Sequence, residues 1–147
     1  MRAALRRLGE RVRWLGVTAE AWYQLARAAV VVRGAARHSR ILRDGLRPHP
    51  GRRDPAGGAE VARAVARASR FHVKPMHCLE RSLAAVWMLR RRGIASALRI
   101  GCRRQGAAHE FHAWVVDDDG GALAGLGHES SFQVLTPEAV PPGTPRP

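Results

Sequence analysis

The chain has 147 residues, with 25 Lys and Arg against 12 Asp and Glu, which gives a formal net charge of +13 at pH 7. That length corresponds to a single domain with one core of modest size, and the hydrophobic fraction of 46% indicates a globular protein rather than a disordered chain. The charge attracts anionic partners such as an acidic peptide, a nucleic acid or a membrane surface, whereas no apolar run is long enough to predict a membrane span.

The N-terminal region predicts two helices. Four apolar residues share one face of the first helix while arginines cover the rest, which is typical of a basic amphipathic helix packed on its own domain: Leu5, Leu8, Val12 and Leu15. Contact with a membrane or a nucleic acid is the alternative. Gly16 and Thr18 interrupt the pattern, so a separate helix is expected from Ala19 to Val32, with a buried face of Trp22, Leu25, Ala26, Ala29 and Val32.

A loop and a further helix follow. Proline, glycine and charged residues make the segment from Arg47 to Gly58 a loop, and a candidate for a mobile segment or an internal boundary. Beyond it, Val61, Val65 and Ala68 recur at helical spacing and predict a helix from Glu60 to Phe71.

A cysteine stands at the start of the next predicted helix. Pro75 disfavours helical geometry in the residue before it, and Gly93 gives a stop signal. Cys78 therefore lies in or just before the first turn, where unsatisfied N–H groups and the positive end of the helix dipole favour a nucleophilic thiolate. The residues that recur on one face of this helix are Leu79, Leu83, Val86 and Leu89.

Two strands come after the cysteine helix. Leu98, Ile100 and Cys102 alternate with polar residues or glycine in a half-buried strand, so Cys102 is expected to be a core thiol rather than a second catalytic or metal-binding residue. The run from Phe111 to Val116 is apolar on both faces, as in a central strand, and it contains His112. Histidine is the usual partner base for a catalytic thiol.

The C-terminal part predicts a turn and weaker strands. The segment 117–121 is rich in Asp and Gly, which is a strong hairpin signal. Short strands are expected at 122–126 and 132–135.

Two stretches carry a family resemblance: "CLERSLAAVWMLRRRGIASALRIG", which begins at Cys78, and "HEFHAWVV", which contains His112. From Glu60 to about Leu126 the chain resembles the transglutaminase-like cysteine protease superfamily, and within it the small free-standing leader peptidase of lasso peptide biosynthesis. The residues that match the pattern are Cys78, Leu79, Ser82, Leu83, Gly93, Ile94, Gly101, His112, Ala113, Trp114 and Val115.

The resemblance implies an α+β fold with a papain-like core, in which N-terminal helices precede a catalytic helix packed on a small antiparallel sheet. The expected organisation is an N-terminal helical region at 1–47, a loop at 48–58, the transglutaminase-like core at 59–136 and a Pro-rich tail at 137–147. The implied activity is cysteine-protease removal of the leader from a ribosomally made lasso precursor peptide, with Cys78 as nucleophile and His112 as base.

The implied partners are the precursor peptide, a small leader-binding recognition protein and an ATP-dependent macrolactam-forming cyclase. Because the chain is short and shows no leader-recognition domain of its own, we expect poor cleavage without the recognition protein. We expect no cofactor and no DNA partner. Since the N-terminus lacks the continuous apolar stretch of a secretory signal, we also expect a cytoplasmic protein with reduced thiols.

The third catalytic group departs from the family pattern. The family carries an aspartate about a dozen residues beyond the histidine, where this chain has Ala124 and Gly125. The aspartates at 117–119 extend the histidine's own strand, so they are interpreted as a solvated turn. If the chain turns at 120–121 without a bulge, Glu129 lies opposite His112 and becomes a candidate orienting group, although a backbone carbonyl could serve instead.

Three other functions remain open from the sequence. The scaffold could transfer an amide rather than hydrolyse it, it could be impaired or inactive as an enzyme, or the chain could be a non-enzymatic basic module that binds nucleic acid through its Arg-rich helices. The seven histidines show no known metal-ligand spacing and no C-x-x-C motif is present, so no metal site is expected.

Overall fold

The computed structural model describes residues 2–34, 39–117, 119–124 and 129–135. Helices come first along the chain and a sheet follows, so the predicted α+β class is confirmed. The helices are α1 (Arg2–Arg33), α2 (Ser39–Leu46), α3 (Pro55–Arg70) and α4 (Cys78–Arg91), together with the short 3-10 helix η1 (Glu129–Ser131). The strands are β1 (Ala97–Gln105), β2 (Ala108–Val116), β3 (Ala122–Ala124) and β4 (Gln133–Val134).

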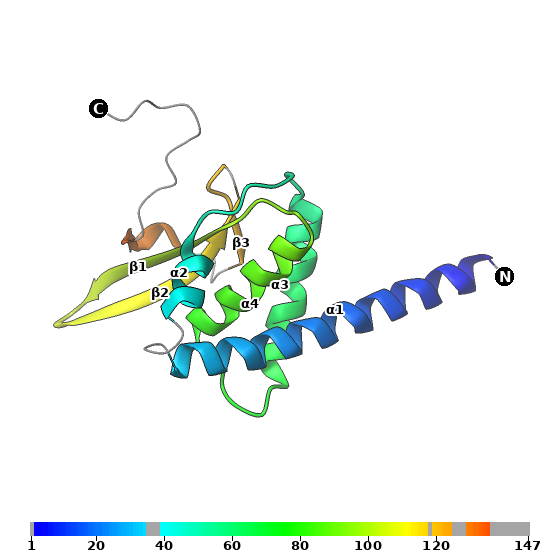
Figure 1. Ribbon diagram of the computed structural model, residues 1–147, viewed down its shortest axis with the longest axis horizontal. Helices are drawn as coiled ribbons and strands as arrows, with labels where there is room; N and C mark the ends of the chain where they lie inside the picture. Colours follow the sequence, from blue (N-terminus) through cyan, green and yellow to red (C-terminus); the bar gives the residue numbers. More distant parts are fainter. Residues whose placement is uncertain (1, 35–38, 118, 125–128, 136–147) are drawn as a thin grey trace.

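The four strands form an antiparallel sheet in the order β3-β2-β1-β4. β1 and β2 make a long hairpin in register from Ala97 opposite Val116 to Gln105 opposite Ala108. The tip of this hairpin projects away from the helices in Figure 1. Phe111, which pairs with Cys102, is 63% exposed, so the prediction that both faces of the strand are buried from 111 onward is wrong at its first residue.

The core surrounds α4, which packs against α1, α3 and one face of the sheet. Every residue from Ser82 to Leu89 is buried, because this helix has neighbours on all sides rather than along one stripe. On the sheet, Ala113 and Val115 belong to this main core, whereas Trp114 and Val116 belong to a second cluster on the opposite face.

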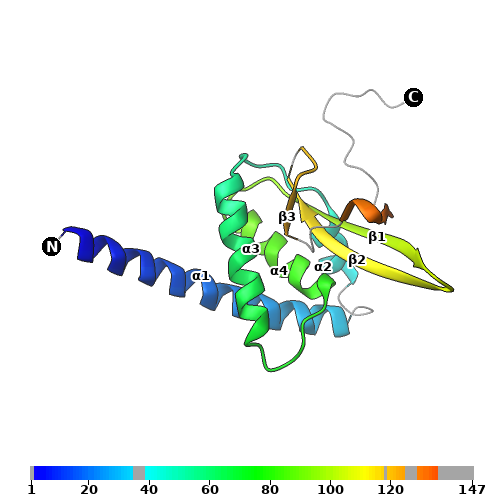
Figure 2. The same ribbon diagram turned by 180° about the vertical axis from the view of Figure 1, so that it is seen from behind.

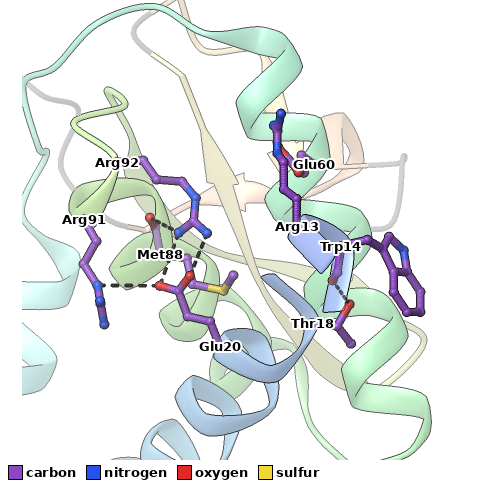
Figure 3. Close-up of polar contacts among 8 residues, drawn as sticks. All are labelled: Arg13, Trp14, Thr18, Glu20, Glu60, Met88, Arg91 and Arg92. Carbon is purple, nitrogen blue, oxygen red and sulfur yellow. Dashed lines mark hydrogen bonds and ion pairs between the residues drawn. The ribbon is translucent and has the colours of Figure 1, made fainter. Parts of the chain in front are cut away.

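α1 is one continuous helix, so the predicted break at Gly16 and Thr18 is wrong. Thr18 stays inside the helix because its Oγ1 donates to the carbonyl of Trp14 at 2.9 Å. Glu20, a little further along, accepts from Arg92 and pairs with Arg91 at the end of α4, as Figure 3 shows. A helix anchored by tertiary contacts accommodates a glycine, whose cost is about 1 kcal/mol.

The buried face of α1 also differs from the predicted one. Leu25 and Ala29 are buried as expected, but Trp22 is 44% exposed and stacks on His72. The face is rotated because both α3 and α4 pack against α1. The residues of α1 that are buried are Ala21, Gln24, Leu25, Ala28, Ala29 and Val31.

The N-terminal end of α1 stands away from the body in Figures 1 and 2. Its apolar stripe is open to solvent, since Leu5, Leu8, Val12 and Leu15 are each between 58% and 63% exposed. The prediction that this helix packs on its own domain is therefore wrong for its first turns. Within the described part of the chain, no helix is long and apolar enough to cross a membrane.

The predicted loop ends earlier than expected, because α3 begins at Pro55 rather than after Gly58. Asp54 caps this helix by accepting from the N–H of Gly57 at 2.8 Å. The loop before it is held by backbone hydrogen bonds: His49 exchanges two with Ser96, and Arg52 donates to Gly93 and accepts from Ala95. These contacts join the loop to the main body, and its mobility stays a prediction. The helix predicted at 60–71 is confirmed, with Val61, Val65 and Ala68 buried.

Candidate active site

Cys78 is the first residue of α4, as the sequence predicted. His77 is the N-cap residue, and its backbone N–H donates to the carboxylate of Glu80 at 2.8 Å. That arrangement leaves the first N–H groups inside the helix without intrahelical partners, next to the Cys78 thiol. The Cys78 side chain is half-buried and is not part of a disulfide.

Glu80 fixes the beginning of this helix. Its side chain is buried, yet it accepts hydrogen bonds from Lys74 Nζ and from the His77 N–H, each at 2.8 Å. Burial alone raises the pKa of the Glu80 carboxyl, but the bonds from Lys74 and His77 outweigh burial and lower that pKa below its ordinary value. The charged carboxylate therefore links the Pro75 turn to the first turn of α4.

His112 lies on β2 and is buried. Its ring stacks on Trp114 with centroids 5.9 Å apart and contacts Phe132 at 5.2 Å, so the imidazole lies on the sheet face of those two aromatic residues. Gly101 is its register partner on β1. A Cβ at Gly101 would come within 2.9 Å of the Trp114 ring, so the stack requires a glycine there.

Cys78 and His112 line the same pocket, which has a volume of about 290 Å³. The wall also includes Ser82, whose Oγ donates to the backbone carbonyl of Ala113 at 2.9 Å and so joins α4 to β2 beside the histidine. Within the described part of the chain, β3 pairs with β2 only at Val115 and Val116, so His112 lies beyond the paired part of that strand edge. The two predicted residues thus come from separate elements to one cavity.

The register that suggested Glu129 as the third group is wrong. Val116 pairs with Ala122 and Val115 with Ala124, with an irregularity between the two pairs. Within the described residues, Glu129 opens η1 and is not part of β3. The irregularity between the two pairs shifts the register from the one that was assumed without a bulge. The role of Glu129 as an orienting group therefore loses its geometric basis and stays a prediction.

The structure also shows where most of the other residues considered for the third catalytic group lie. Ala124 lines the pocket, while Gly125 lies outside the described residues. Asp117 accepts hydrogen bonds from the N–H groups of Asp119 and Gly121, as expected of a turn. Asp118 lies outside the described residues.

Cys102 is half-buried and does not line the pocket with Cys78. Within the described residues, no three His, Cys, Asp or Glu side chains cluster in a way that could hold a metal ion.

Several pocket residues were not singled out as functional from the sequence. Arg63 comes from α3, Arg81 from α4 and Leu123 from β3. For Arg81, its place three residues after Cys78 on the same helix was an available signal. For Arg63 and Leu123 the sequence held no local signal, because only tertiary packing brings α3 and β3 to the cysteine.

Comparison with known families places this architecture in a class. A family model described as the transglutaminase-like superfamily matches residues 21–136. The match covers more than half of the chain, so this protein belongs to the transglutaminase-like superfamily, which includes cysteine proteases. It also begins within α1, so the matched region is wider than the predicted core at 59–136. No curated protein and no solved structure matched the chain significantly.

Proposed function

We propose that this protein is a cysteine peptidase that removes the leader from a ribosomally synthesised lasso precursor peptide. The observation that carries the proposal is the shared pocket of Cys78, at the N-terminus of α4, and His112, on β2. Membership of the transglutaminase-like superfamily supports peptidase chemistry in general. The sequence resemblance to lasso leader peptidases supports the particular substrate.

In the proposed reaction, the His112 imidazole takes the proton of the Cys78 thiol and the sulfur attacks the scissile amide carbonyl. The C–N bond breaks as the imidazolium protonates the leaving amine, which becomes the N-terminus of the core peptide. The leader stays on the sulfur as a thioester. A water molecule, deprotonated by the imidazole, then attacks the thioester and releases the leader as a carboxylic acid.

The oxyanion formed at the carbonyl needs hydrogen-bond donors. The His77 N–H is already bonded to Glu80, so it does not serve. The backbone N–H groups of Cys78 and Leu79 open the helix and are the donors we assign to this role.

Mass spectrometry of a candidate precursor tests the proposal. Wild type should release leader and core, Cys78→Ala and His112→Ala should not, and Cys102→Ala should cleave like wild type. Circular dichroism shows that the variants are folded. Cleavage by a folded Cys78→Ala variant would refute the proposal.

The same experiment separates hydrolysis from amide transfer. Hydrolysis gives a leader with a free carboxylate, whereas transfer gives a leader joined to an added amine, and the two differ in mass. Adding the leader-binding recognition protein should raise the cleavage rate. Equal rates with and without it would contradict that partner.

A further inference from the structure

Two arginines line the pocket of the candidate nucleophile. Arg63 of α3 and Arg81 of α4 line the pocket that contains Cys78 and His112. No Asp or Glu is among the described residues of that wall. The positive end of the α4 dipole lies at the same place.

Neither arginine has an ion pair or a side-chain hydrogen bond within the described residues. Other arginines of the chain do have carboxylate partners: Arg13 with Glu60, Arg92 with Glu20 and Arg103 with Glu110. With a net charge of +13, unpaired arginines are expected on the surface, so the missing partner says little by itself. The location of the arginines is the more informative observation. Arg81 is half-buried and lies one helical turn from Cys78.

We propose that Arg63 and Arg81 bind a carboxylate of the peptide substrate, namely an acidic side chain close to the scissile bond. This inference rests on the proposed function and names the specificity of the same site. Guanidinium groups form charge-assisted, bidentate hydrogen bonds with carboxylates, and such bonds are about twice as strong as neutral ones. A basic side chain at that substrate position would be repelled by both arginines.

Alkylation with a matched pair of reagents tests this without a known substrate. Iodoacetate carries a carboxylate and iodoacetamide is its neutral counterpart, and both alkylate a thiolate. In a Cys102→Ser background, Cys78 should show a rate ratio of iodoacetate to iodoacetamide on the order of tenfold above that of mercaptoethanol, which corresponds to about 1.4 kcal/mol. The ratio should fall as salt is added.

Substitution of the arginines tests whether they cause the preference of Cys78 for iodoacetate. Arg63→Gln and Arg81→Gln should each lower the ratio, and the double variant should lower it further, toward the mercaptoethanol value. Arg104→Gln is the matched control, because Arg104 lies near the hairpin tip and not in the pocket, and it should leave the ratio unchanged. The inference is overturned if wild-type Cys78 shows the same ratio as mercaptoethanol. It is also overturned if neither Arg63→Gln nor Arg81→Gln changes the ratio.

The outcomes separate this inference from the proposed function. Fast reaction with iodoacetamide but no preference for iodoacetate removes the carboxylate site and leaves the nucleophile. If Cys78 reacts with neither reagent, the nucleophile is in doubt, and NMR of the Cys78 and Leu79 amides then decides on binding. N-acetylglutamate α-amide should shift these amides and its glutamine analogue should not. Equal effects would overturn the carboxylate site.

The source of the carboxylate is tested by protection of Cys78 from iodoacetamide. N-acetylglutamate α-amide presents a side-chain carboxylate, whereas N-acetylalanine presents an α-carboxylate. The first should protect better than the second. Better protection by N-acetylalanine would contradict recognition of an internal acidic residue.

Discussion

At the residue scale, the site depends on a few buried polar groups that fix backbone positions around Cys78 and His112. Glu80 is the most constrained of them, because its buried carboxylate accepts from both Lys74 and the His77 N–H. The lowered pKa of this carboxyl means that the folded state holds the charged form more strongly than the unfolded chain does. This contribution to stability is complete above the ordinary glutamate pKa and is lost as the pH falls through the lowered value in the folded state.

Glu80→Gln should therefore lower the free energy of unfolding at neutral pH by about 1–3 kcal/mol, since Lys74 loses a charged partner. The difference from wild type should shrink as the pH falls from the ordinary glutamate pKa, about 4.3, through the lowered pKa of the folded state, because the wild-type carboxyl then becomes protonated as well. Urea unfolding followed by circular dichroism at several pH values measures both effects. A difference that grows toward acid pH would contradict the assigned role of Glu80.

Gly101 is constrained in a different way. A Cβ at this position would meet the carbonyl of Gln133 and the ring of Trp114, each at 2.9 Å. Gly101→Ala should destabilise the protein by about 1–3 kcal/mol through overpacking. It should also slow the alkylation of Cys78, because Trp114 holds the His112 ring. Gly106→Asn, at the hairpin turn, is the control that leaves alkylation unchanged.

At the element scale, α4 and β2 are joined next to the candidate nucleophile by one buried hydrogen bond, from Ser82 Oγ to the Ala113 carbonyl. Ser82→Ala removes this buried hydrogen bond from the Ala113 carbonyl and should cost about 1–3 kcal/mol of stability. If the bond also sets the spacing of Cys78 and His112, alkylation of Cys78 should slow more than the loss of stability explains. Unchanged alkylation in a destabilised variant would limit Ser82 to a structural role.

The two halves of α1 should respond differently to substitution. Leu8→Ser changes an exposed side chain and should alter the free energy of unfolding by less than about 0.5 kcal/mol. Leu25→Ala removes a fully buried side chain and should cost about 2–5 kcal/mol. Thermal and urea unfolding of the two variants measure this contrast. Equal destabilisation would mean that the first turns of α1 pack against the protein.

For the molecule as a whole, the elements that local sequence signals predict agree with those in the structure. Pro75, the Leu periodicity and Gly93 were enough to place α4 and its cysteine, and Gly93 indeed adopts a positive φ of 63°. Features that depend on tertiary packing could not be predicted from local sequence signals. α1, which packs against α3 and α4, is continuous past Gly16, and Phe111 is exposed although it begins an apolar run.

The site was predicted in part for the same reason. Cys78 and His112 were found because their types and positions carry a family pattern. The prediction of Glu129 depends on an assumed register between β2 and β3. The irregularity between these strands gives a different register. Arg63 reaches the pocket only through the packing of α3, which no local pattern near the cysteine reveals.

In the proposed mechanism, His112 activates Cys78. The most direct measurement is the rate of iodoacetamide alkylation of Cys78 at neutral pH in the Cys102→Ser background, with and without His112→Ala. We predict that removal of the imidazole slows alkylation at least about tenfold while the variant remains folded, because the histidine no longer takes the thiol proton. Equal rates in the two folded proteins would contradict the claim.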